Sequence, residues 1–313
     1  MPKVSVCIPV YNVECYIKRC LESILNQSIE DIEVIVVNDC TPDNSIDIVR
    51  KYAEQDKRIK IIEHNTNHGL MFARRTGYMA ASGDYITFCD SDDSLVPGSL
   101  ELLYSTASST LADIVAGQFQ VIYNDGRVLS QAIKLEYGKD AYGLAKSLLR
   151  NQIGHNLCGK LFKRELLQDY SYQTFDNLIN GEDGCLLYQL LPNMHRIETV
   201  CSPVYNYYQN SDSSTHAKLS KRGIDNILIT NTIRVRICRL FPDLYTDLFH
   251  VESIVLINLF ANGYNSDGFL RKGIQRYGLE EYINPHSILK HYNFLFALKL
   301  LGKLYIKPLF LAR

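Results

Sequence analysis

Tyr85-Ile86-Thr87-Phe88-Cys89-Asp90-Ser91-Asp92-Asp93 is the stretch of sequence that indicates the fold most directly. Its first five residues are apolar or β-branched and predict a short buried strand, after which three carboxylates occur within four residues. Carboxylates this close repel one another unless a cation lies among them. The stretch therefore predicts a strand that ends at a cation-binding edge, although the same acidic residues could instead cap the helix that follows.

The residues before this stretch alternate between strand and helix patterns. Apolar strands are predicted at 4–9, 33–37 and 59–62, and helices at 13–25, 43–52 and 69–81. Apolar strands joined by helices indicate an α/β fold with a mostly parallel, Rossmann-like sheet flanked by helices. Such sheets bind ligands at the carboxyl ends of their strands. Polar or acidic residues follow all four strands, at 9–12, 38–39, 63–67 and 90–93.

The remaining two thirds of the chain divide into two parts. Residues 114–123 predict a strand, and the turn Asn124-Asp125-Gly126 predicts a hairpin with a second strand. Helices are expected at 99–108, 140–150, 160–168, 182–191 and across most of 222–262. We therefore expect a catalytic domain over residues 1–218 and a mainly helical region over 219–313.

Composition limits the classes of partner. The formal charge of the 313 residues is −1, which gives no overall field that would attract nucleic acid. Nine cysteines without a C-x-x-C pair favour a reduced, cytoplasmic setting. The chain runs from Met1 directly into a strand without an apolar leader, and it contains no run of eighteen apolar residues. We therefore expect a cytoplasmic protein without a spanning helix.

Two nucleotide-binding signatures are missing from the sequence. It has no G-x-x-x-x-G-K-[ST], and no G-x-G-x-x-G after the first strand, which argues against P-loop and dinucleotide-binding enzymes. Phosphates would then be held by a metal and basic side chains. The carboxylates of 90–93 are hard oxygen ligands that suit Mg²⁺ or Mn²⁺.

Two other strand ends allow more than one interpretation. Asp39 could accept a hydrogen bond from a nucleobase, or could cap the turn that leads to Pro42. The segment 9–12 offers backbone groups and the ring of Tyr11 for stacking on a base, or is simply where a strand ends.

Many short motifs occur together in order along the first hundred residues. They are Val6-Cys7-Ile8-Pro9-Val10-Tyr11-Asn12, Leu21-Glu22-Ser23-Ile24-Leu25-Asn26-Gln27-Ser28, Val36-Val37-Asn38-Asp39, Asn67-His68-Gly69, Ala73-Arg74, Ala80-Ala81-Ser82-Gly83-Asp84 and the acidic stretch. With these motifs, residues 3–100 resemble the family 2 inverting glycosyltransferases of bacterial cell-surface polysaccharide type. The likeness extends to about residue 215. It implies the nucleotide-diphospho-sugar transferase (GT-A) fold.

The resemblance implies a role for particular residues. Those implied to bind the nucleotide are Pro9, Val10, Tyr11, Asn12, Glu14, Asp39, Asn67, Gly69, Arg74, Asp90 and Ser91. Asp92, with Asp90 and His216, is implied to hold Mn²⁺ or Mg²⁺. Gly181-Glu182-Asp183-Gly184 matches the motif that carries the catalytic base, which makes Asp183 the base. Glu182 and Lys160 are expected on the acceptor side.

The chemistry agrees with this assignment. Inverting transfer needs a carboxylate that deprotonates the acceptor hydroxyl while that hydroxyl attacks the anomeric carbon, and a cation that neutralises the leaving diphosphate. Without the resemblance, Glu182 and Asp183 could equally be acidic residues in a first helical turn. The sequence departs from the family at Gln209, where Arg is common, and at Arg75-Thr76, where Asn is common.

The resemblance also suggests the partners. The expected donor is a nucleotide-diphosphate sugar, with UDP-hexose as the commonest type, and the expected acceptor is a glycan or lipid-linked glycan. Lys299, Lys303 and Lys307 recur at four-residue spacing in an apolar tail, which is typical of a helix on a membrane surface. A helix packed on the protein or in a homodimer interface is the alternative.

Two rival functions remain open at this stage. A metal-dependent nucleotidyltransferase also uses carboxylates on an α/β sheet, but it would need a basic, glycine-rich triphosphate loop that is absent near the first strand. A catalytically idle sugar-nucleotide-binding module would not need Asp183, so a donor-hydrolysis assay would separate it from an enzyme.

Overall fold

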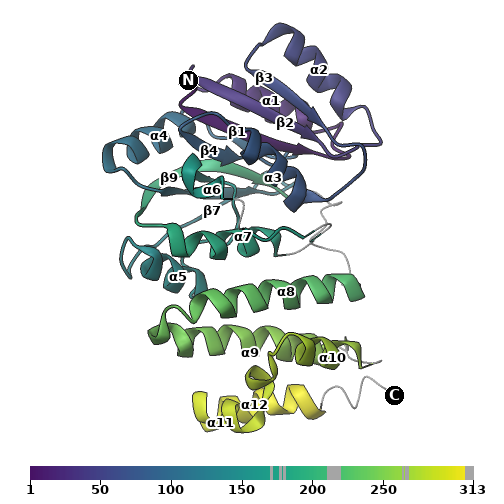
Figure 1. Cartoon of the computed structure of the whole chain (residues 1–313), viewed down its shortest axis with the longest axis vertical. Helices are drawn as coiled ribbons and strands as arrows, with labels where there is room; N and C mark the ends of the chain where they lie inside the picture. The colour runs from purple at the N-terminus through teal and green to yellow at the C-terminus, as the bar shows by residue number, and fades with distance from the viewer. Residues whose placement is uncertain are drawn as a thin grey trace. The chain divides into compact units, whose positions relative to one another are not determined.

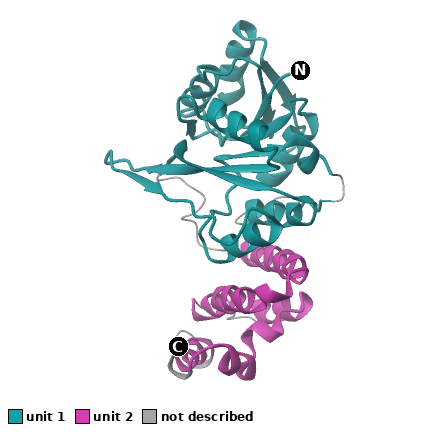
Figure 2. Ribbon diagram, turned by 90° about the vertical axis from the view of Figure 1, so that its left-hand side faces the viewer, with its two compact units in different colours: residues 1–216 teal, residues 217–313 magenta. Residues whose placement is uncertain are grey.

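The structure is a computed structural model of the 313-residue chain. It describes residues 1–169, 172–175, 178, 181–209, 220–262, 264 and 268–306, without the side chains of 294, 295, 305 and 306. The chain forms two compact units, residues 1–216 and 217–313, which Figure 2 colours separately.

The first half of unit 1 is a parallel sheet. Its strands are β1 (Val4–Val10), β2 (Ile32–Asn38), β3 (Ile59–Glu63) and β4 (Tyr85–Phe88), in the order β3-β2-β1-β4. The connecting helices are α1 (Ile17–Leu25), α2 (Ser45–Gln55) and α3 (Leu70–Ala80), as Figure 1 shows. Every residue of β1 and β2 is buried, which explains their uninterrupted apolar runs. The predicted strand–helix alternation is confirmed here.

Beyond β4 the sheet is mixed. The elements that follow are β5 (Ser94–Leu95), α4 (Ser99–Thr110), β6 (Ile114–Ile122), β7 (Val128–Gln131), α5 (Ala141–Leu149), β8 (Lys160–Lys163), α6 (Arg164–Leu167), α7 (Glu182–Leu190), a 3₁₀ turn (Leu191–Asn193) and β9 (Ile197–Tyr208). Strand β8 is antiparallel to both β4 and β6, whereas β6 and β9 are parallel. The predicted parallel arrangement therefore holds for the first four strands, and the hairpin β6–β7 is confirmed.

Two predicted helices have different bounds in the structure. Residues 160–163 form strand β8, and only Arg164–Leu167 is helical. Leu161 and Phe162 are fully buried in a ladder between β4 and β6, so pairing with distant strands overrides the local pattern. Helix α1 begins at Ile17 instead of Val13, whose backbone N–H donates to the Ser45 hydroxyl at 3.0 Å.

Unit 2 is helical, as expected. Its helices are α8 (Lys221–Cys238), α9 (Tyr245–Ala261), α10 (Phe269–Arg276), α11 (Pro285–His291) and α12 (Phe294–Leu301), with 3₁₀ turns at Pro242–Leu244 and Glu280–Ile283 and a π turn at Gly302–Ile306. Arg234 of α8 and Glu252 of α9 form a buried ion pair at 2.6 Å. By length and composition, Pro242–Ala261 could cross a membrane, but 56% of it is buried inside the protein. That burial and the ion pair are typical of a core helix.

The C-terminal tail is broken into shorter helices. Asn293 separates α11 from α12 and accepts a hydrogen bond from the Phe296 N–H at 3.0 Å, which caps α12. Leu300 and Leu304 are buried, whereas Leu298 is 47% exposed. Residue 307 lies outside the described residues, so only two of the three predicted lysines can be placed.

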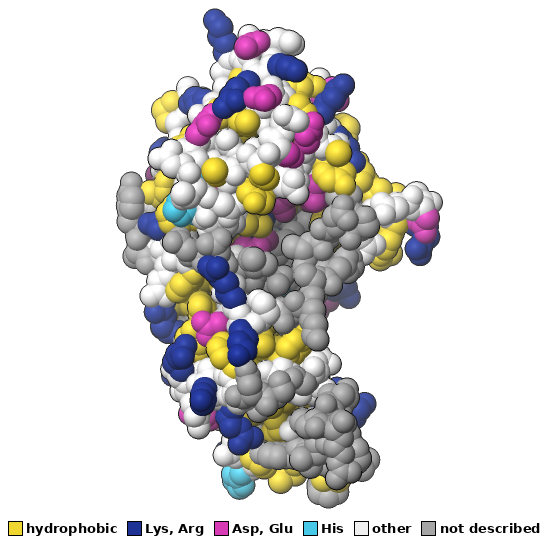
Figure 3. Space-filling model, turned by 90° about the vertical axis from the view of Figure 1, so that its right-hand side faces the viewer, with side chains coloured by type: hydrophobic (Ala, Val, Ile, Leu, Met, Phe, Trp, Pro, Cys, Tyr) yellow, Lys and Arg dark blue, Asp and Glu magenta, His cyan; other side chains and the backbone are white. Residues whose placement is uncertain are grey.

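Charge is distributed unevenly along the chain. Residues 217–313 contain fourteen Lys and Arg against seven Asp and Glu, although the formal charge of the whole chain is −1. The charge of unit 2 is therefore +7, and that of residues 1–216 is −8. On the face that Figure 3 draws, Lys and Arg outnumber Asp and Glu among the coloured side chains of the lower part.

A buried carboxylate joins the elements of the parallel sheet. Glu33 of β2 is 3% exposed and accepts hydrogen bonds from the Ser5 and Ser82 hydroxyls and from the Lys60 ammonium, at 2.6–2.8 Å. Burial alone would raise its pKa. The hydrogen bonds from Lys60, Ser5 and Ser82 outweigh this effect and lower the pKa of Glu33 to about 2.

This cluster predicts a pH-dependent stability. The pKa of Glu33 is about 2 in the folded protein and near 4.5 otherwise, so its stabilisation is present above pH 4.5 and is lost as the pH falls toward 2. The difference corresponds to about 3 kcal/mol at pH 7 and about half of that at pH 3. In urea unfolding, we expect the wild type to exceed Glu33→Gln in free energy of unfolding by about 3 kcal/mol at pH 7 and by about half of that at pH 3.

The matched control is Glu63→Gln. Glu63 pairs with Arg50 at 2.6 Å, but its side chain is 49% exposed. Its loss should cost at most about 1 kcal/mol. A gap between wild type and Glu33→Gln that stays constant from pH 7 to pH 3 would contradict the role given to Glu33.

Candidate active site

The candidate site is built around helix α3. Asp39, directly after β2, is 3% exposed and accepts the backbone N–H groups of His68 at 3.0 Å and Gly69 at 2.8 Å. These are donors at the N-terminus of α3, where Gly69 has a φ of 89°. Asp39 therefore binds the backbone directly before this helix, and not the turn to Pro42 that the sequence suggested as one alternative.

The ring of His64 also contacts the Asp39 carboxylate and helps to fix its position. Its Nδ1 lies 2.8 Å from Asp39 Oδ1, and its Nε2 lies 2.8 Å from the Thr76 hydroxyl. His64 is not among the site residues predicted from the sequence. A polar residue directly after β3 was the available signal, but its partners come from β2 and α3 and could not be paired from sequence. Among the described residues, Asp39 Oδ2 accepts a hydrogen bond from the Gly69 N–H, and its other lone pair can accept one from a ligand.

The other predicted nucleotide-binding residues lie at the neighbouring strand end. Pro9 and Val10 are buried in β1, and the Val10 carbonyl accepts the Asp39 N–H at 3.0 Å. The ring of Tyr11 is 49% exposed and open for stacking. Asn12 has a φ of 55° and donates its N–H to Thr41 at 2.8 Å. Tyr11 and Asp39 thus belong to adjacent strand ends.

Three further residues of this group differ in accessibility. The Glu14 carboxylate accepts hydrogen bonds from the side chain and backbone of Asn44, so it joins two loops. Asn67 is exposed, whereas Ser91 is 6% exposed. Glu14 is also exposed, so only Ser91 of these three residues is buried.

Arg74 is the centre of the charged part of the site. It projects from α3, is 2% exposed and contacts Asp90 at 2.7 Å, Glu182 at 3.7 Å and Asp183 at a shorter distance. Burial would lower the pKa of Arg74, but the charges of Asp183 and Asp90 raise it well above its usual value. One buried cation therefore brings together the ends of β4 and the start of α7.

Glu182 and Asp183 stand in the first turn of α7, after Gly181 with a φ of 116°. Burial and the charge of Asp183 raise the pKa of Glu182 to about 7, against the opposing effect of Arg74. Burial also raises the pKa of Asp183, and Arg74 again opposes it. Asp183 Oδ2 accepts the Leu157 N–H at 3.0 Å, while Glu182 Oε2 is buried and has no hydrogen-bond partner within the described part of the chain.

Asp93 differs from the other acids of the stretch 90–93. It is 1% exposed and accepts hydrogen bonds from the Tyr205 hydroxyl at 2.7 Å and the Tyr208 N–H at 2.9 Å. Burial, followed by the charges of Asp92 and Asp90, raises its pKa to about 8. Protonation of Asp93 therefore relieves part of the repulsion that the sequence indicated. Tyr205, which also accepts the Asp90 N–H at 3.0 Å, was missed because it lies on distant β9.

Asp90 and Asp92 are the acids of this stretch that could bind a metal ion. Among residues 1–169, 181–209 and the other described residues, no group of three or more His, Cys, Asp or Glu is arranged to hold a metal. Mg²⁺ at phosphate sites needs only one or two carboxylates, because the phosphates and water complete the octahedron. Asp90, with a 30% exposed side chain, and half-buried Asp92 fit this mode. His216 lies outside the described residues.

Lys160 approaches the same cluster from β8. It is 3% exposed, and its ammonium donates to the carbonyls of Gly154 at 2.9 Å and of Asn156. Burial lowers the pKa of Lys160 to about 8, and the charge of Asp183 opposes this shift. The structure therefore groups Arg74, Asp90, Glu182 and Asp183 by direct contact, with Lys160 close enough to interact by charge.

The family described as "Glycosyl transferase family 2" matches residues 5–171, which include β1–β4, the acidic stretch and Lys160. The chain belongs to glycosyl transferase family 2. This confirms the resemblance inferred from the motifs.

This family 2 chain is similar to a curated relative and to two solved structures. Glycosyltransferase EpsJ of Bacillus subtilis, itself described as uncharacterized, is 33% identical over 69% of this chain and 63% of its own length. The chain thus spans less than two thirds of that relative. TarS of Staphylococcus aureus in complex with UDP-GlcNAc has a TM-score of 0.72 at 19% identity, over 99% of this chain and 89% of that structure.

The second solved structure is more distant. The mannosyltransferase PcManGT of Pyrobaculum calidifontis, in complex with GDP-Man and Mn²⁺, has a TM-score of 0.59 at 17% identity, over 100% of this chain and 88% of that one. At these identities, both structures establish the fold, which is the expected GT-A arrangement of a mixed sheet flanked by helices.

The contacts of Arg74 predict a strong effect on stability. Arg74→Met would leave Asp90, Glu182 and Asp183 without their shared buried cation, which should cost about 3–5 kcal/mol in urea unfolding. In the double variant Arg74→Met/Asp183→Asn, the cost should be at least about 1 kcal/mol less than the sum of the two single costs.

Arg75→Met is the matched control. Arg75 follows Arg74 on α3 and contacts the Thr174 hydroxyl instead of a carboxylate. Its loss should cost about 1 kcal/mol or less. Equal costs for both arginine variants, with additive double-variant energies, would show that Arg74 does not hold the acids together.

Proposed function

We propose that this chain is an inverting glycosyltransferase that moves a sugar from a nucleotide-diphosphate sugar, UDP-hexose in particular, to an acceptor hydroxyl of a growing cell-surface glycan. The observation that carries this proposal is the buried contact of Arg74 with both Asp90 and Asp183. Through this contact, the end of β4, where a donor phosphate would lie, is linked to Asp183, a carboxylate that can act as a base. Family 2 membership supports the same reaction class.

The donor would lie along the carboxyl ends of β1, β2 and β4. The exposed ring of Tyr11 is available to stack on the base, and Asp39 Oδ2 to accept from a base N–H. The buried guanidinium of Arg74 supplies charge for the diphosphate. UDP-GlcNAc in TarS and GDP-Man in PcManGT share a sugar diphosphate but differ in base, so the uridine is the more specific part of the proposal.

A divalent cation would be held by Asp92 and Asp90. When bound, Mn²⁺ or Mg²⁺ supplies positive charge that stabilises the leaving diphosphate. PcManGT is described in complex with Mn²⁺, which supports this choice. Asp93, held protonated by burial, stays out of the ligand set and positions the segment through Tyr205 and Tyr208.

Asp183 would be the catalytic base. Burial raises its pKa, which brings a carboxylate closer to the range in which it accepts a proton effectively near neutral pH. The Leu157 N–H and Arg74 fix its two oxygens, so it is oriented before the acceptor binds. Glu182, whose second oxygen has no partner among the described residues, is placed to orient the acceptor.

The rival functions differ in what they need from these residues. A nucleotidyltransferase would use the metal site but would not need a base at Asp183. An idle binding module would need neither catalysis nor the pKa shifts that burial imposes on Glu182 and Asp183. Perturbed carboxylates grouped around one cation are more typical of a catalytic site than of a binding module.

The first prediction concerns the base. Asp183→Asn should reduce sugar transfer by about 10³-fold or more, because the acceptor hydroxyl loses its base, while donor affinity changes less than about threefold. Transfer is measured as nucleoside diphosphate released in the presence of acceptor, and donor affinity by calorimetry.

Glu182→Gln, at the neighbouring position of the same helical turn, is the control. It should raise the acceptor KM and leave much of kcat, since Glu182 is proposed to orient the acceptor. If Glu182→Gln abolishes transfer and Asp183→Asn does not, the two carboxylates have the opposite roles.

The second prediction concerns the metal. Asp92→Ala should weaken Mn²⁺-dependent UDP binding by about tenfold or more, because one of two metal ligands is lost. UDP is titrated calorimetrically with Mn²⁺ and with a chelator. Asp84→Ala, at an exposed carboxylate before the other end of β4, serves as the control outside the site. Identical UDP affinity in all these conditions would argue that the donor site does not use a cation.

A further inference from the structure

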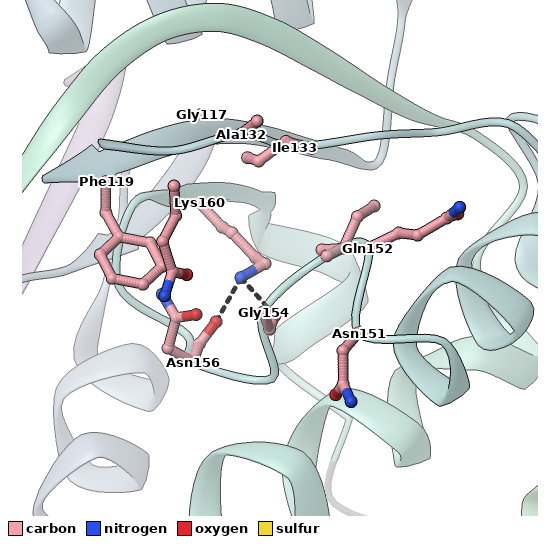
Figure 4. Close-up of a pocket in the computed structure, with 11 residues that line it drawn as sticks. Gly117, Phe119, Ala132, Ile133, Asn151, Gln152, Gly154, Asn156 and Lys160 are labelled. Carbon is pink, nitrogen blue, oxygen red and sulfur yellow. Dashed lines mark hydrogen bonds between the residues drawn. The ribbon is translucent and has the colours of Figure 1, made fainter. Parts of the chain in front are cut away.

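The structure contains a pocket beside the candidate active site. Of the predicted site residues, only Lys160 lines it. Its volume is about 400 Å³, and it is lined by residues of β6, of β7 and the segment after it, and of the loop 151–156 (Figure 4). This volume lies within the range of about 300–1,000 Å³ that is typical of small-molecule sites.

The pocket exists because one edge of β6 changes partner. Residues 114–116 of β6 pair with β8, and residues 119–122 pair with β7. Between them β6 has a register irregularity against β9 at Gly117 and Gln118. Gly117 and Phe119 line the pocket at this gap, with Gln131 and Ala132 on the β7 side and Lys160 on the β8 side. The cavity is thus part of the sheet architecture.

The pocket lies on the same rim as the candidate active site. Strand β8 begins at Lys160 beside the end of β4, where the Thr87 hydroxyl donates to the Lys160 carbonyl at 2.8 Å. Hydrogen bonds hold the segment 154–160 both within itself and to Asp183. Lys160 binds the carbonyls of Gly154 and Asn156, and the Leu157 N–H binds Asp183 at 3.0 Å. One short segment therefore separates the pocket from the proposed base.

The chemistry of the lining indicates the kind of ligand. Among the described residues that line the pocket there is no Asp or Glu, and the single charge is the buried ammonium of Lys160. Figure 4 shows this ammonium between Asn156 and Gly154, with the ring of Phe119 beside Asn156, while the side-chain ends of Asn151 and Gln152 turn away from it. An ammonium has three N–H donors, and the described carbonyls accept two.

A hydroxyl-rich molecule fits these groups. A hydroxyl oxygen can accept the third N–H of Lys160, the amide of Asn156 can exchange hydrogen bonds with neighbouring hydroxyls, and the Phe119 ring can pack on the C–H face of a sugar. A cationic ligand is disfavoured by the buried charge. A purely apolar ligand would leave that N–H unpaired at a cost.

We infer that this pocket binds a hydroxyl-rich unit of the acceptor, either a sugar ring or an alditol. The inference rests on the proposed glycosyl transfer, and it assigns to the pocket the acceptor unit next to the hydroxyl that reacts. Lys160 and Phe119 then help to determine which acceptors are used, whereas Arg74, Asp90 and Asp92 bind the donor.

The test blocks the pocket without disturbing the core. Ala132 is exposed and lines the pocket, so Ala132→Trp should fill it with little effect on folding. Val128, 54% exposed at the start of β7 and outside the lining, gives the control Val128→Trp. Phe119→Ala removes the aromatic face. Thermal unfolding and UDP affinity should be unchanged in Ala132→Trp and Val128→Trp.

The probes are methyl glycosides of hexoses and N-acetylhexosamines, together with ribitol, titrated by saturation-transfer NMR into protein saturated with UDP and Mn²⁺. We expect at least one probe to bind the wild type and Val128→Trp equally, and to bind Ala132→Trp and Phe119→Ala at least about tenfold more weakly. Preference for a glycoside or for ribitol decides between a sugar ring and an alditol.

Two outcomes would overturn the inference. One is that Ala132→Trp binds the probe as the wild type does. The other is that no probe binds wild-type protein that does bind UDP. Failure of the proposed function is distinguishable from both, because in that case no nucleotide sugar is bound or hydrolysed by the wild type, whatever the probes do.

Discussion

The buried charge of Arg74 is the interaction on which the candidate site depends. A guanidinium that is 2% exposed cannot be stable without anionic partners, and its partners come from two distant parts of the chain, at Asp90 and at Glu182-Asp183. The carboxylates of Glu182 and Asp183 depend on the same contact, because burial removes them from water as well. Helix α3 must therefore be held firmly in place, and Asp39 contributes to this by binding the backbone of His68 and Gly69 directly before its first turn. Asp39, Arg74 and the acids that contact Arg74 are thus connected through α3.

The sequence was sufficient to predict the first half of unit 1. Fully buried parallel strands need continuous apolar residues, so β1 and β2 were visible in the chain itself, and polar residues at their ends marked the ligand edge. The acidic start of α7 was visible too, but the role of Asp183 came from the family resemblance. Geometry now places Asp183 against Arg74, while its catalytic role stays a prediction.

What the sequence could not supply was pairing between distant segments. Residues 160–163 are too short and too ambiguous to identify as a strand until β4 and β6 are known to flank them. The same reason hid Tyr205 and His64, whose importance lies in partners 112 and 25 residues away. The pocket beside Phe119 follows from a change of strand partner and has no local signal. The cytoplasmic location, the membrane contact of the tail, and a homodimer all stay predictions.

Charge balance explains why the acidic stretch can serve a single divalent cation. Three carboxylates follow β4, but burial against Tyr205 and Tyr208 leaves Asp93 largely protonated near neutral pH, with a pKa of about 8. Asp90 shares the charge of Arg74, so its second oxygen and Asp92 together present less than two full negative charges. A cation held there alone would be weakly bound, and a diphosphate would supply the missing charge. On this balance, metal and donor should bind together, each improving the site for the other.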